Sequence, residues 1–240
     1  MCPQTERPNG TASADRDFVA WNEEMVERYD IERYYERSHR VVRWLEHRRL
    51  DALVEMASPQ PGERVLEVGC GAGHVLEQFR NVQRTGVDLS EGMIRRARAR
   101  LGIDATLLRA SAERLPFEAG EFDIVVCTEV LEHVPDPAAV IAELTRVAAP
   151  GGRVVVSIPN EVNIDRIKRT IRRLPVLRQL LRTLAAEGNE WHLHHFDLAL
   201  LHRIVEGQAT VARLRPLPAG VLPLRYVALL HGHTDTGRRA

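Results

Sequence analysis

The stretch that decides the fold is residues 64–74, which reads RVLEVGCGAGH. Its first half is a short run rich in branched apolar residues, which is typical of a buried β-strand. Its second half places glycines at positions 69, 71 and 73, where the backbone can turn sharply and approach a ligand closely. In open parallel sheets ligands bind beyond the carboxyl ends of the strands. The stretch therefore predicts a binding loop that joins a strand to a helix.

The glycine spacing differs from that of a dinucleotide-binding loop. Such a loop reads G-x-G-x-x-G, and here the last position would be His74. Glu67, two residues before the first glycine, would repel a pyrophosphate but would suit a ligand that carries an amino group. Taken alone, the loop could also be a purely structural turn between a strand and a helix.

Strand-like and helix-like segments alternate on both sides of this loop. Such an alternation indicates βαβ units, hence an α/β fold with a mainly parallel, doubly wound sheet. The expected strands are 64–68, 84–89, 105–109, 122–127 and 153–158, with two more at 210–214 and 224–230. The expected helices are 75–79, 92–101 and 137–148, the last opened by Asp136 as its N-cap.

The chain divides into three parts by composition. Residues 1–16 are polar and contain prolines, so we expect a flexible tail. Residues 17–58 repeat apolar side chains at helical spacing, which predicts a helical N-terminal cap whose Tyr35 closes over the ligand. Residues 59–240 then form the main domain, with a helical lid insertion at 161–190.

Charge and cysteine content exclude several classes of protein. Lys and Arg number 33 and Asp and Glu number 33, and a neutral chain is not a general polyanion binder. Three widely spaced cysteines form neither a disulfide framework nor a metal motif, which favours a reducing compartment. No transmembrane stretch or signal peptide is recognisable. We therefore expect a cytoplasmic protein, with or without peripheral attachment to the inner face of the membrane.

Further motif blocks follow the glycine loop in a fixed order. Asp88 ends the second expected strand, where a carboxylate can accept both hydroxyls of a ribose. Residues 111–113 (SAE) follow the third strand, 122–137 read FDIVVCTEVLEHVPDP, and 146–160 read RVAAPGGRVVVSIPN. In order and spacing these blocks resemble the class I S-adenosylmethionine-dependent methyltransferases, especially the group containing the ubiquinone- and menaquinone-biosynthesis enzymes. The resemblance is strong over residues 60–160.

The resemblance implies a fold and a cofactor. The fold would be Rossmann-like, with seven mostly parallel strands and an antiparallel last strand at 224–230. The cofactor would be S-adenosyl-L-methionine and the product S-adenosyl-L-homocysteine. By the same resemblance the cofactor-binding residues would be Glu67, Gly69 and Gly71 at the methionine part, Gly73 in the same loop, Asp88 at the ribose, Leu89, Met93, Ser111, Ala112 and Glu113 around the adenine, and Thr128 at the sulfonium. Many relatives have Asp at the position of Ser111, and Leu89 and Met93 could equally be core residues.

A cluster of acids and histidines suggests how an acceptor could be activated. A hydroxyl acceptor must lose its proton, either to a base such as histidine or with the help of a metal ion. Glu129, Glu132 and His133 are spaced i, i+3 and i+4, so they project on one side of a helical turn. Carboxylates and imidazoles are good ligands for divalent ions. The later segment 191–196, WHLHHF, offers more imidazoles.

This pairing resembles the metal site of the small-RNA 3′-terminal 2′-O-methyltransferases. The resemblance implies a Mg²⁺, Mn²⁺ or Zn²⁺ site formed by Glu129, Glu132, His133 and His194, with His192 the next choice for the fourth ligand. Two alternatives stay open. His133, with Glu132, could be a metal-free catalytic base that orients the substrate, or it could simply pack.

The insertion is basic and amphipathic. Isoleucines and leucines recur every three or four residues, arginines lie between them, and Pro175 should divide it into two helices. Its apolar face could cover the acceptor pocket, rest on an anionic membrane through residues 163–185, contact RNA phosphates, or form a dimer contact. The neutral total charge makes nucleic acid an improbable partner.

These observations predict methyl transfer to a small molecule, most simply at a hydroxyl of a secondary-metabolite or quinone- or lipid-like acceptor. Methylation at carbon or nitrogen stays open because the fold does not fix the acceptor atom. The alternatives are a metal-dependent 2′-O-methyltransferase of RNA 3′ ends and a non-catalytic cofactor-binding protein of the same fold. The protein would be a monomer or a homodimer.

Overall fold

The computed structural model describes residues 11–28, 40–173, 191–220 and 222–232. Its seven strands form one sheet in the order β3-β2-β1-β4-β5-β7-β6. The strands are β1 (Arg64–Val68), β2 (Gln83–Asp88), β3 (Ala105–Arg109), β4 (Phe122–Thr128), β5 (Ala148–Pro159), β6 (Ala209–Leu217) and β7 (Arg225–Gly232). The first five pair in parallel, whereas β7 runs antiparallel to both of its neighbours. The predicted mostly parallel sheet with an antiparallel last strand is confirmed.

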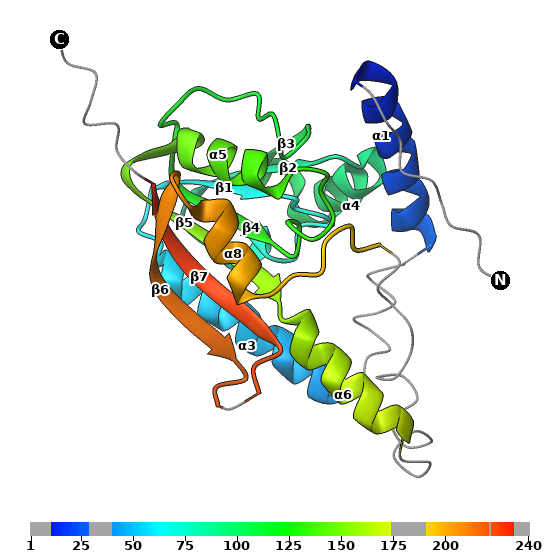
Figure 1. The fold of residues 1–240 in the computed structure, drawn as a ribbon. Coiled ribbons are helices and arrows are strands. Elements are labelled where there is room, and N and C mark those ends of the chain that lie inside the picture. The colour runs from blue at the N-terminus through cyan, green and yellow to red at the C-terminus, as the bar shows by residue number, and fades with distance from the viewer. Residues whose placement is uncertain (1–10, 29–39, 174–190, 221, 233–240) are drawn as a thin grey trace.

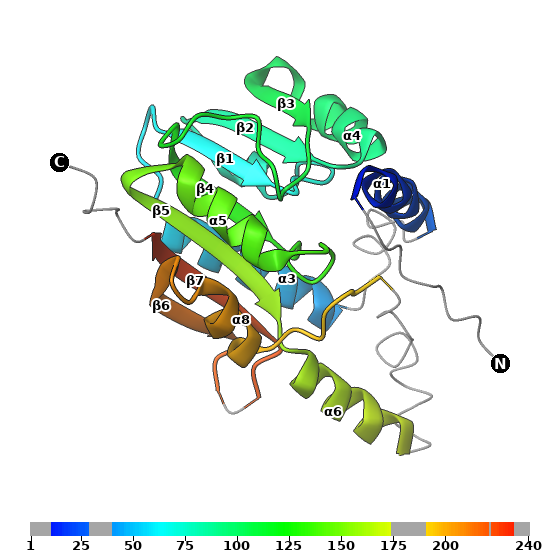
Figure 2. The same cartoon turned by 45° about the horizontal axis from the view of Figure 1, so that its top comes forward.

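Helices cover both faces of the sheet (Figures 1 and 2). The elements on one side are α3 (Arg40–Ala57), α4 (Glu91–Leu101) and the 3-10 turns η1 (Leu76–Gln78) and η2 (Gly102–Asp104), and those on the other are α5 (Pro137–Val147) and α8 (Leu198–Val205). Each layer encloses its own apolar cluster against β1, β4 and β5. This arrangement is the doubly wound α/β fold that the sequence predicts.

The two N-terminal helices occupy different places. Helix α3 buries Ala52, Leu53 and Met56 in the core, so it belongs to the sheet layer rather than to an added cap. Helix α1 (Thr11–Arg28) instead lies beside α4 at the carboxyl edge of the sheet (Figure 2). It begins inside the segment predicted to be a flexible tail, because residues 11–16 continue into α1 without proline or glycine. Tyr35 lies outside the described residues.

Some boundaries differ from the predicted ones for local reasons. The expected helix 75–79 is only the 3-10 turn η1, because the chain is already extended at Phe79 and must enter β2 four residues later. Strand β6 continues through Pro216, beyond the expected end at 214. A proline is tolerated there because β6 is the edge strand of the sheet, where a missing N–H breaks no ladder.

Helix α6 (Glu161–Arg173) leaves the end of β5 and extends away from the sheet (Figure 2). It covers the first half of the predicted insertion. The expected second helix, together with Pro175, lies outside the described residues. No helix within the described ranges is both long and apolar enough to span a membrane.

Candidate active site

The glycine loop joins β1 to η1 with all three glycines at positive φ, 73° at Gly69, 50° at Gly71 and 83° at Gly73. A Cβ atom on Gly69 would lie 2.2 Å from Cγ2 of Val130, so this glycine permits close packing against the turn after β4. A Cβ atom on Gly71 would meet nothing within 4 Å. The loop therefore packs tightly at Gly69 and borders open space at Gly71, as a loop that cradles a ligand requires.

Asp88, at the end of β2, is held in place by two backbone N–H groups. Gly71 N donates to its Oδ2 at 2.8 Å, and Ser90 N donates to its Oδ1 at 2.9 Å. Burial raises the pKa of Asp88, and these two hydrogen bonds oppose the rise. Each oxygen keeps a further lone pair, so a pair of vicinal hydroxyls, such as those of a ribose, could still bind.

Glu67, in β1, is 1% exposed, and its Oε2 has no hydrogen-bond partner among the described residues. Burial raises its pKa well above the usual value, and the guanidinium of Arg49 is the first influence that opposes the rise. Arg49 comes from α3, is 3% exposed and donates from Nε to Glu46 at 3.0 Å. A buried carboxyl beside a buried guanidinium matches the zwitterionic end of an amino acid. Sequence reasoning missed Arg49, since no motif marks it.

The residues predicted around the adenine lie after β2 and β3. Met93 is 2% exposed and packs with Ala72 of the glycine loop and Val26 of α1. The Met93 side chain therefore belongs to the buried packing between the glycine loop and α1. Glu113 accepts at Oε1 from the backbone N–H of Asp136 at 2.7 Å, which fixes the loop after β3 to the start of α5.

The remaining predicted cofactor residues are placed at the same edge. Ser111 accepts at Oγ from Glu113 N at 3.2 Å, and Ala112 packs against the core. Leu89 follows Asp88 directly, and its carbonyl accepts from Arg109. Thr128 ends β4 and is 7% exposed. The structure therefore gathers the predicted cofactor residues at the carboxyl edge of β1, β2, β3 and β4.

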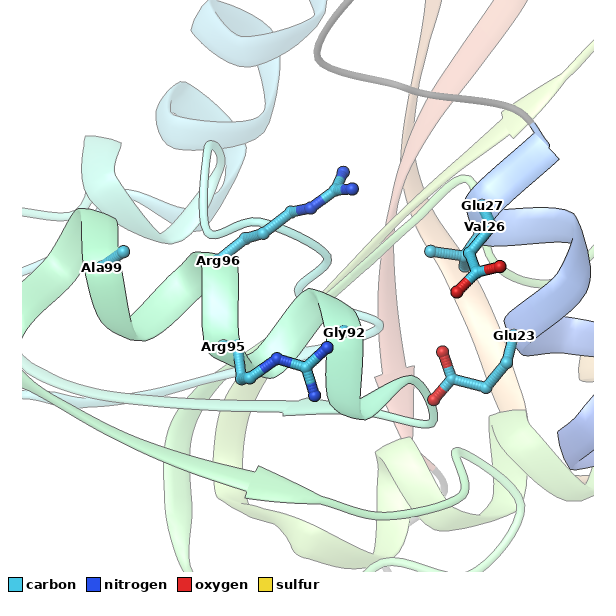
Figure 3. Close-up of a pocket in the computed structure, with 7 residues that line it drawn as sticks. All are labelled: Glu23, Val26, Glu27, Gly92, Arg95, Arg96 and Ala99. Carbon is cyan, nitrogen blue, oxygen red and sulfur yellow. The ribbon is translucent and has the colours of Figure 1, made fainter.

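A separate pocket of about 280 Å³ lies between α1 and α4 (Figure 3). Glu23 and Glu27 on α1 face Arg95 and Arg96 on α4 across it. None of the predicted site residues lines it, and its volume falls just below the range of roughly 300–1,000 Å³ that ligand sites occupy. The pocket is therefore a gap beside the site rather than the site itself.

The two glutamates of the acidic turn after β4, residues 129–133, have different surroundings. Glu129 has φ 53°, accepts from Ser157 Oγ at 2.9 Å, and lies 3.4 Å from Arg225. Glu132 has a side chain that is 2% exposed, and its Oε2 lacks a hydrogen bond to any described residue. Burial, and then the charge of Glu129, raise the pKa of Glu132 well above its usual range. The uncharged carboxyl is therefore favoured unless a cation or donor joins Glu132.

His133 and His192 each have Nδ1 within hydrogen-bond distance of an oxygen atom. His133 Nδ1 lies 3.2 Å from the carbonyl oxygen of Trp191, and His192 Nδ1 lies 2.6 Å from Oε1 of Glu161. A carbonyl only accepts, so Nδ1 of His133 carries the proton and Nε2 keeps its lone pair. Burial, followed by the neighbouring His192, lowers the pKa of His133 to about 4. His133 is therefore neutral near pH 7.

Glu132, His133 and His192 form a group whose ligand atoms lie within 4.8 Å of one another. Nε2 of His133 is 3.9 Å from Oε1 of Glu132. His194 is not brought into this group, because its Nε2 lies 2.9 Å from the carbonyl oxygen of Val134. Glu129 is also outside the group. The structure thus brings together two of the four predicted metal ligands and adds His192, the second choice for the fourth.

Comparison with known proteins agrees with this geometry. Residues 66–156 match a family described as a methyltransferase domain. A ubiquinone biosynthesis O-methyltransferase of Thiobacillus denitrificans is 42% identical over 114 residues, which are 45% of this chain and 49% of that protein. The chain thus spans about half the length of this relative. The protein of the same name from Aeromonas salmonicida is 27% identical over 212 residues, 85% of each chain.

Solved structures share the fold. An S-adenosylmethionine-dependent methyltransferase from Mesorhizobium loti superposes with a TM-score of 0.57 at 18% identity, over 78% of this chain and 97% of that one. The sheet order, the glycine loop and the matched domain agree with one another. Residues 66–156 are therefore similar to a methyltransferase domain, within a fold that solved S-adenosylmethionine-dependent methyltransferases share.

Proposed function

We propose that this protein transfers a methyl group from S-adenosylmethionine to a hydroxyl group of a small, quinol-like acceptor. The observation that carries the proposal is the neutral imidazole of His133, in the turn after β4 whose Val130 packs against Gly69 of the glycine loop. The names of the relatives, which are O-methyltransferases of ubiquinone biosynthesis, support a hydroxyl as the acceptor.

The residues at the carboxyl edge fit the proposed cofactor. Asp88 would accept the ribose hydroxyls, and Glu67 with Arg49 would hold the amino-acid end. The unpartnered Oε2 of Glu67 and the open space above Gly71 are the features that this ligand would fill. When bound, S-adenosylmethionine supplies an electrophilic methyl group on a sulfonium, so the protein needs to supply only alignment and proton removal.

His133 would remove the proton of the acceptor hydroxyl. Its Nδ1–H is held by the carbonyl of Trp191, so the ring is oriented and Nε2 can accept a proton. Its low pKa keeps the imidazole uncharged at neutral pH, which preserves the lone pair. The partial negative charge of Glu132 Oε1, 3.9 Å from Nε2, would stabilise the imidazolium that forms.

A metal-assisted form of the same reaction has its own support. Glu132, His133 and His192 converge, and the unpartnered Oε2 of Glu132 is an atom that a cation would satisfy. A divalent ion held there would lower the pKa of the acceptor hydroxyl. In this form His133 and His192 would act as ligands through Nε2, and the proton of the acceptor hydroxyl would pass to solvent water.

Calorimetric titration with S-adenosylhomocysteine tests the proposal. The protein is stripped of metal, titrated, and titrated again with Mg²⁺, Mn²⁺ or Zn²⁺ present. We expect micromolar binding, followed by methylation of a catechol or hydroquinone panel that His133→Gln lowers by roughly 10²–10⁴-fold. No binding would refute the cofactor assignment. Activity restored only by a metal would select the metal-assisted form.

The proposed acceptor is lipophilic, and α6 supports peripheral contact with an anionic membrane. Ile164 and Ile167 repeat along α6, while Arg166, Arg169 and Arg173 are exposed. A basic amphipathic helix of this kind binds anionic lipid surfaces. Flotation with phosphatidylglycerol vesicles should carry the protein upward at low salt. Equal flotation with phosphatidylcholine vesicles, or none with either, would contradict this contact.

A further inference from the structure

We propose that Glu161 is a positioning residue that fixes the tautomer and the orientation of His192 in the Glu132–His133–His192 group. The inference rests on the proposed function for the role of that group, and on geometry alone for the contacts of Glu161. Glu161 is the first residue of α6, and its side chain is 2% exposed. No sequence motif includes it.

The carboxylate of Glu161 bonds two parts of the 191–196 segment. Its Oε1 lies 2.6 Å from Nδ1 of His192, and its Oε2 accepts the backbone N–H of Phe196 at 2.6 Å. The backbone N–H of Glu161 donates in turn to the carbonyl of Phe196 at 3.0 Å. Phe196 is fully buried, so the 191–196 segment is anchored in the core at the residue that Glu161 bonds.

The contact decides which nitrogen of His192 carries the proton. A carboxylate oxygen at 2.6 Å accepts from an N–H, so in the neutral ring Nδ1 of His192 is the donor and Nε2 keeps the lone pair. A histidine that acts through one nitrogen commonly gives the other N–H to a carboxylate or carbonyl. Glu161 does this for His192, as the Trp191 carbonyl does for His133.

The opposite side of the segment is held by the acidic turn after β4. The backbone N–H groups of Leu193 and His194 donate to the carbonyl of Glu132, at 2.8 and 3.3 Å. The rings of His133 and His192 meet edge to face with centroids 4.8 Å apart. The position of His192 relative to Glu132 is therefore fixed by two sets of contacts. The Glu132 carbonyl holds the backbone, and Glu161 also orients the His192 ring.

The chain contains a matched control for a test. Asp165 lies one turn further along α6, and its Oδ2 is 3.2 Å from Nε2 of His195 in the same segment. This pair is exposed, with side chains 39% and 54% accessible. Asp165→Asn therefore breaks a carboxylate–imidazole contact between the same two elements without touching the proposed site.

The experiment compares wild type, Glu161→Gln and Asp165→Asn in the full chain. Glutamine keeps the size and one acceptor oxygen for Phe196 N, but its amide group can donate to Nδ1 of His192 and so favours the other tautomer. Nitrogen-15 NMR of labelled imidazoles reads the tautomer directly. Co²⁺ absorption titration reads metal affinity, and S-adenosylhomocysteine calorimetry reads the cofactor site.

We expect His192 to carry its proton on Nδ1 in wild type and in Asp165→Asn, and to shift toward the Nε2-protonated form in Glu161→Gln. Co²⁺ affinity should fall by about 10–100-fold in Glu161→Gln alone. Binding of S-adenosylhomocysteine should be unchanged in all three proteins. If Glu161→Gln does not fold, the His192 tautomer is measured in wild type and in Glu161→Asp. Aspartate is a shorter carboxylate, and we expect it to keep the proton on Nδ1 of His192.

An Nε2-protonated His192 in wild type would overturn the inference. So would an unchanged tautomer in Glu161→Gln, or an equal loss of Co²⁺ affinity in Asp165→Asn. Failure of the proposed function has a different signature, the absence of S-adenosylhomocysteine binding while the His192 tautomer still follows Glu161. If wild type binds no Co²⁺, the metal-assisted form fails, and the tautomer alone supports or refutes the role of Glu161.

Discussion

The carboxylate of Glu23 on α1 accepts the hydroxyl proton of Ser90 at 2.7 Å, across 67 residues of sequence. Ser90 is the N-cap of α4, and its Oγ accepts the backbone N–H of Met93 at 3.1 Å. The second oxygen of Glu23 accepts the backbone N–H of Glu91 at 2.8 Å. Helix α1 thus supplies part of the cap of α4, next to Asp88.

Replacing Glu23 by alanine should therefore destabilise the protein. It leaves one N–H at the start of α4 without its acceptor, and losses of caps cost about 0.5–2 kcal/mol. Urea unfolding monitored by circular dichroism would measure the change. Glu27→Ala, on the same helix, is the control and should change stability by less than about 0.5 kcal/mol. Equal effects of the two substitutions would show that Glu23 contributes nothing as a cap.

Replacing Asp88 by alanine should weaken S-adenosylhomocysteine binding by about 1.5–3 kcal/mol, the worth of hydrogen bonds to a charged group. Calorimetry measures the change directly. Asp104→Ala is a suitable comparison, because Asp104 is an exposed carboxylate in η2 that pairs with Arg84 at 3.6 Å. An affinity that Asp88→Ala leaves unchanged would mean that the ribose is held elsewhere.

Gly69→Ala should cost about 2–5 kcal/mol of stability. The new Cβ would overlap Val130, and its residue would keep a left-handed backbone, which costs about 1–2 kcal/mol on its own. Val130→Ala removes the overlapped methyl group. In that background the cost of Gly69→Ala should shrink to the backbone part, which a double-mutant cycle of thermal unfolding would measure. Full additivity would exclude the contact as the cause.

The pKa of His133 gives metal-stripped protein a defined pH dependence. Folding lowers this pKa from 6.5 to about 4, so between these values the unfolded chain binds more protons than the native one. Stability should therefore fall as the pH drops through this window, by up to about 3 kcal/mol, and His133→Gln should lack this component. Urea unfolding of both proteins at about pH 7 and about pH 4.5 measures it.

Glu132 should show the opposite sign. Its pKa is raised in the native state, so the native protein keeps this proton to a higher pH than the unfolded chain does. The native state therefore loses stability as the pH rises above 4.5. Glu132→Gln should remove that loss. Parallel profiles for wild type and both variants would show that neither group titrates differently in the native state.

The positions of the glycine loop and of Asp88 could be predicted from the sequence because their signals are local. The glycines at 69 and 71 have conformations that few other residues adopt, and Asp88 ends a short strand whose partners are set by the fold. Asp136 likewise caps α5 as predicted, accepting from the N–H groups of Ala138 and Ala139. Each of these roles is decided within a few residues.

The acceptor half depends on contacts that no local pattern encodes. The choice between His192 and His194 follows from the path of the 191–196 segment, which Glu161 and the carbonyl of Glu132 set from distant parts of the chain. Arg49 is marked only by its burial beside Glu67. A sequence offers three histidines at this segment, and only the tertiary structure distinguishes them.

The anchoring of the 191–196 segment also bears on the order in which the protein folds. Its contact with the acidic turn after β4 spans 58 residues between His133 and Trp191, and its contact with α6 spans 35 residues between Glu161 and Phe196. Closing such long loops loses more chain entropy than closing a short turn. The segment should therefore dock after the β1–β5 sheet has formed. The amide protons of Leu193 and Phe196 would then exchange with solvent through partial opening of the structure. Exchange of the β4 amide protons would require global unfolding. A nascent or partly opened chain could thus keep its cofactor loop and yet have no acceptor site.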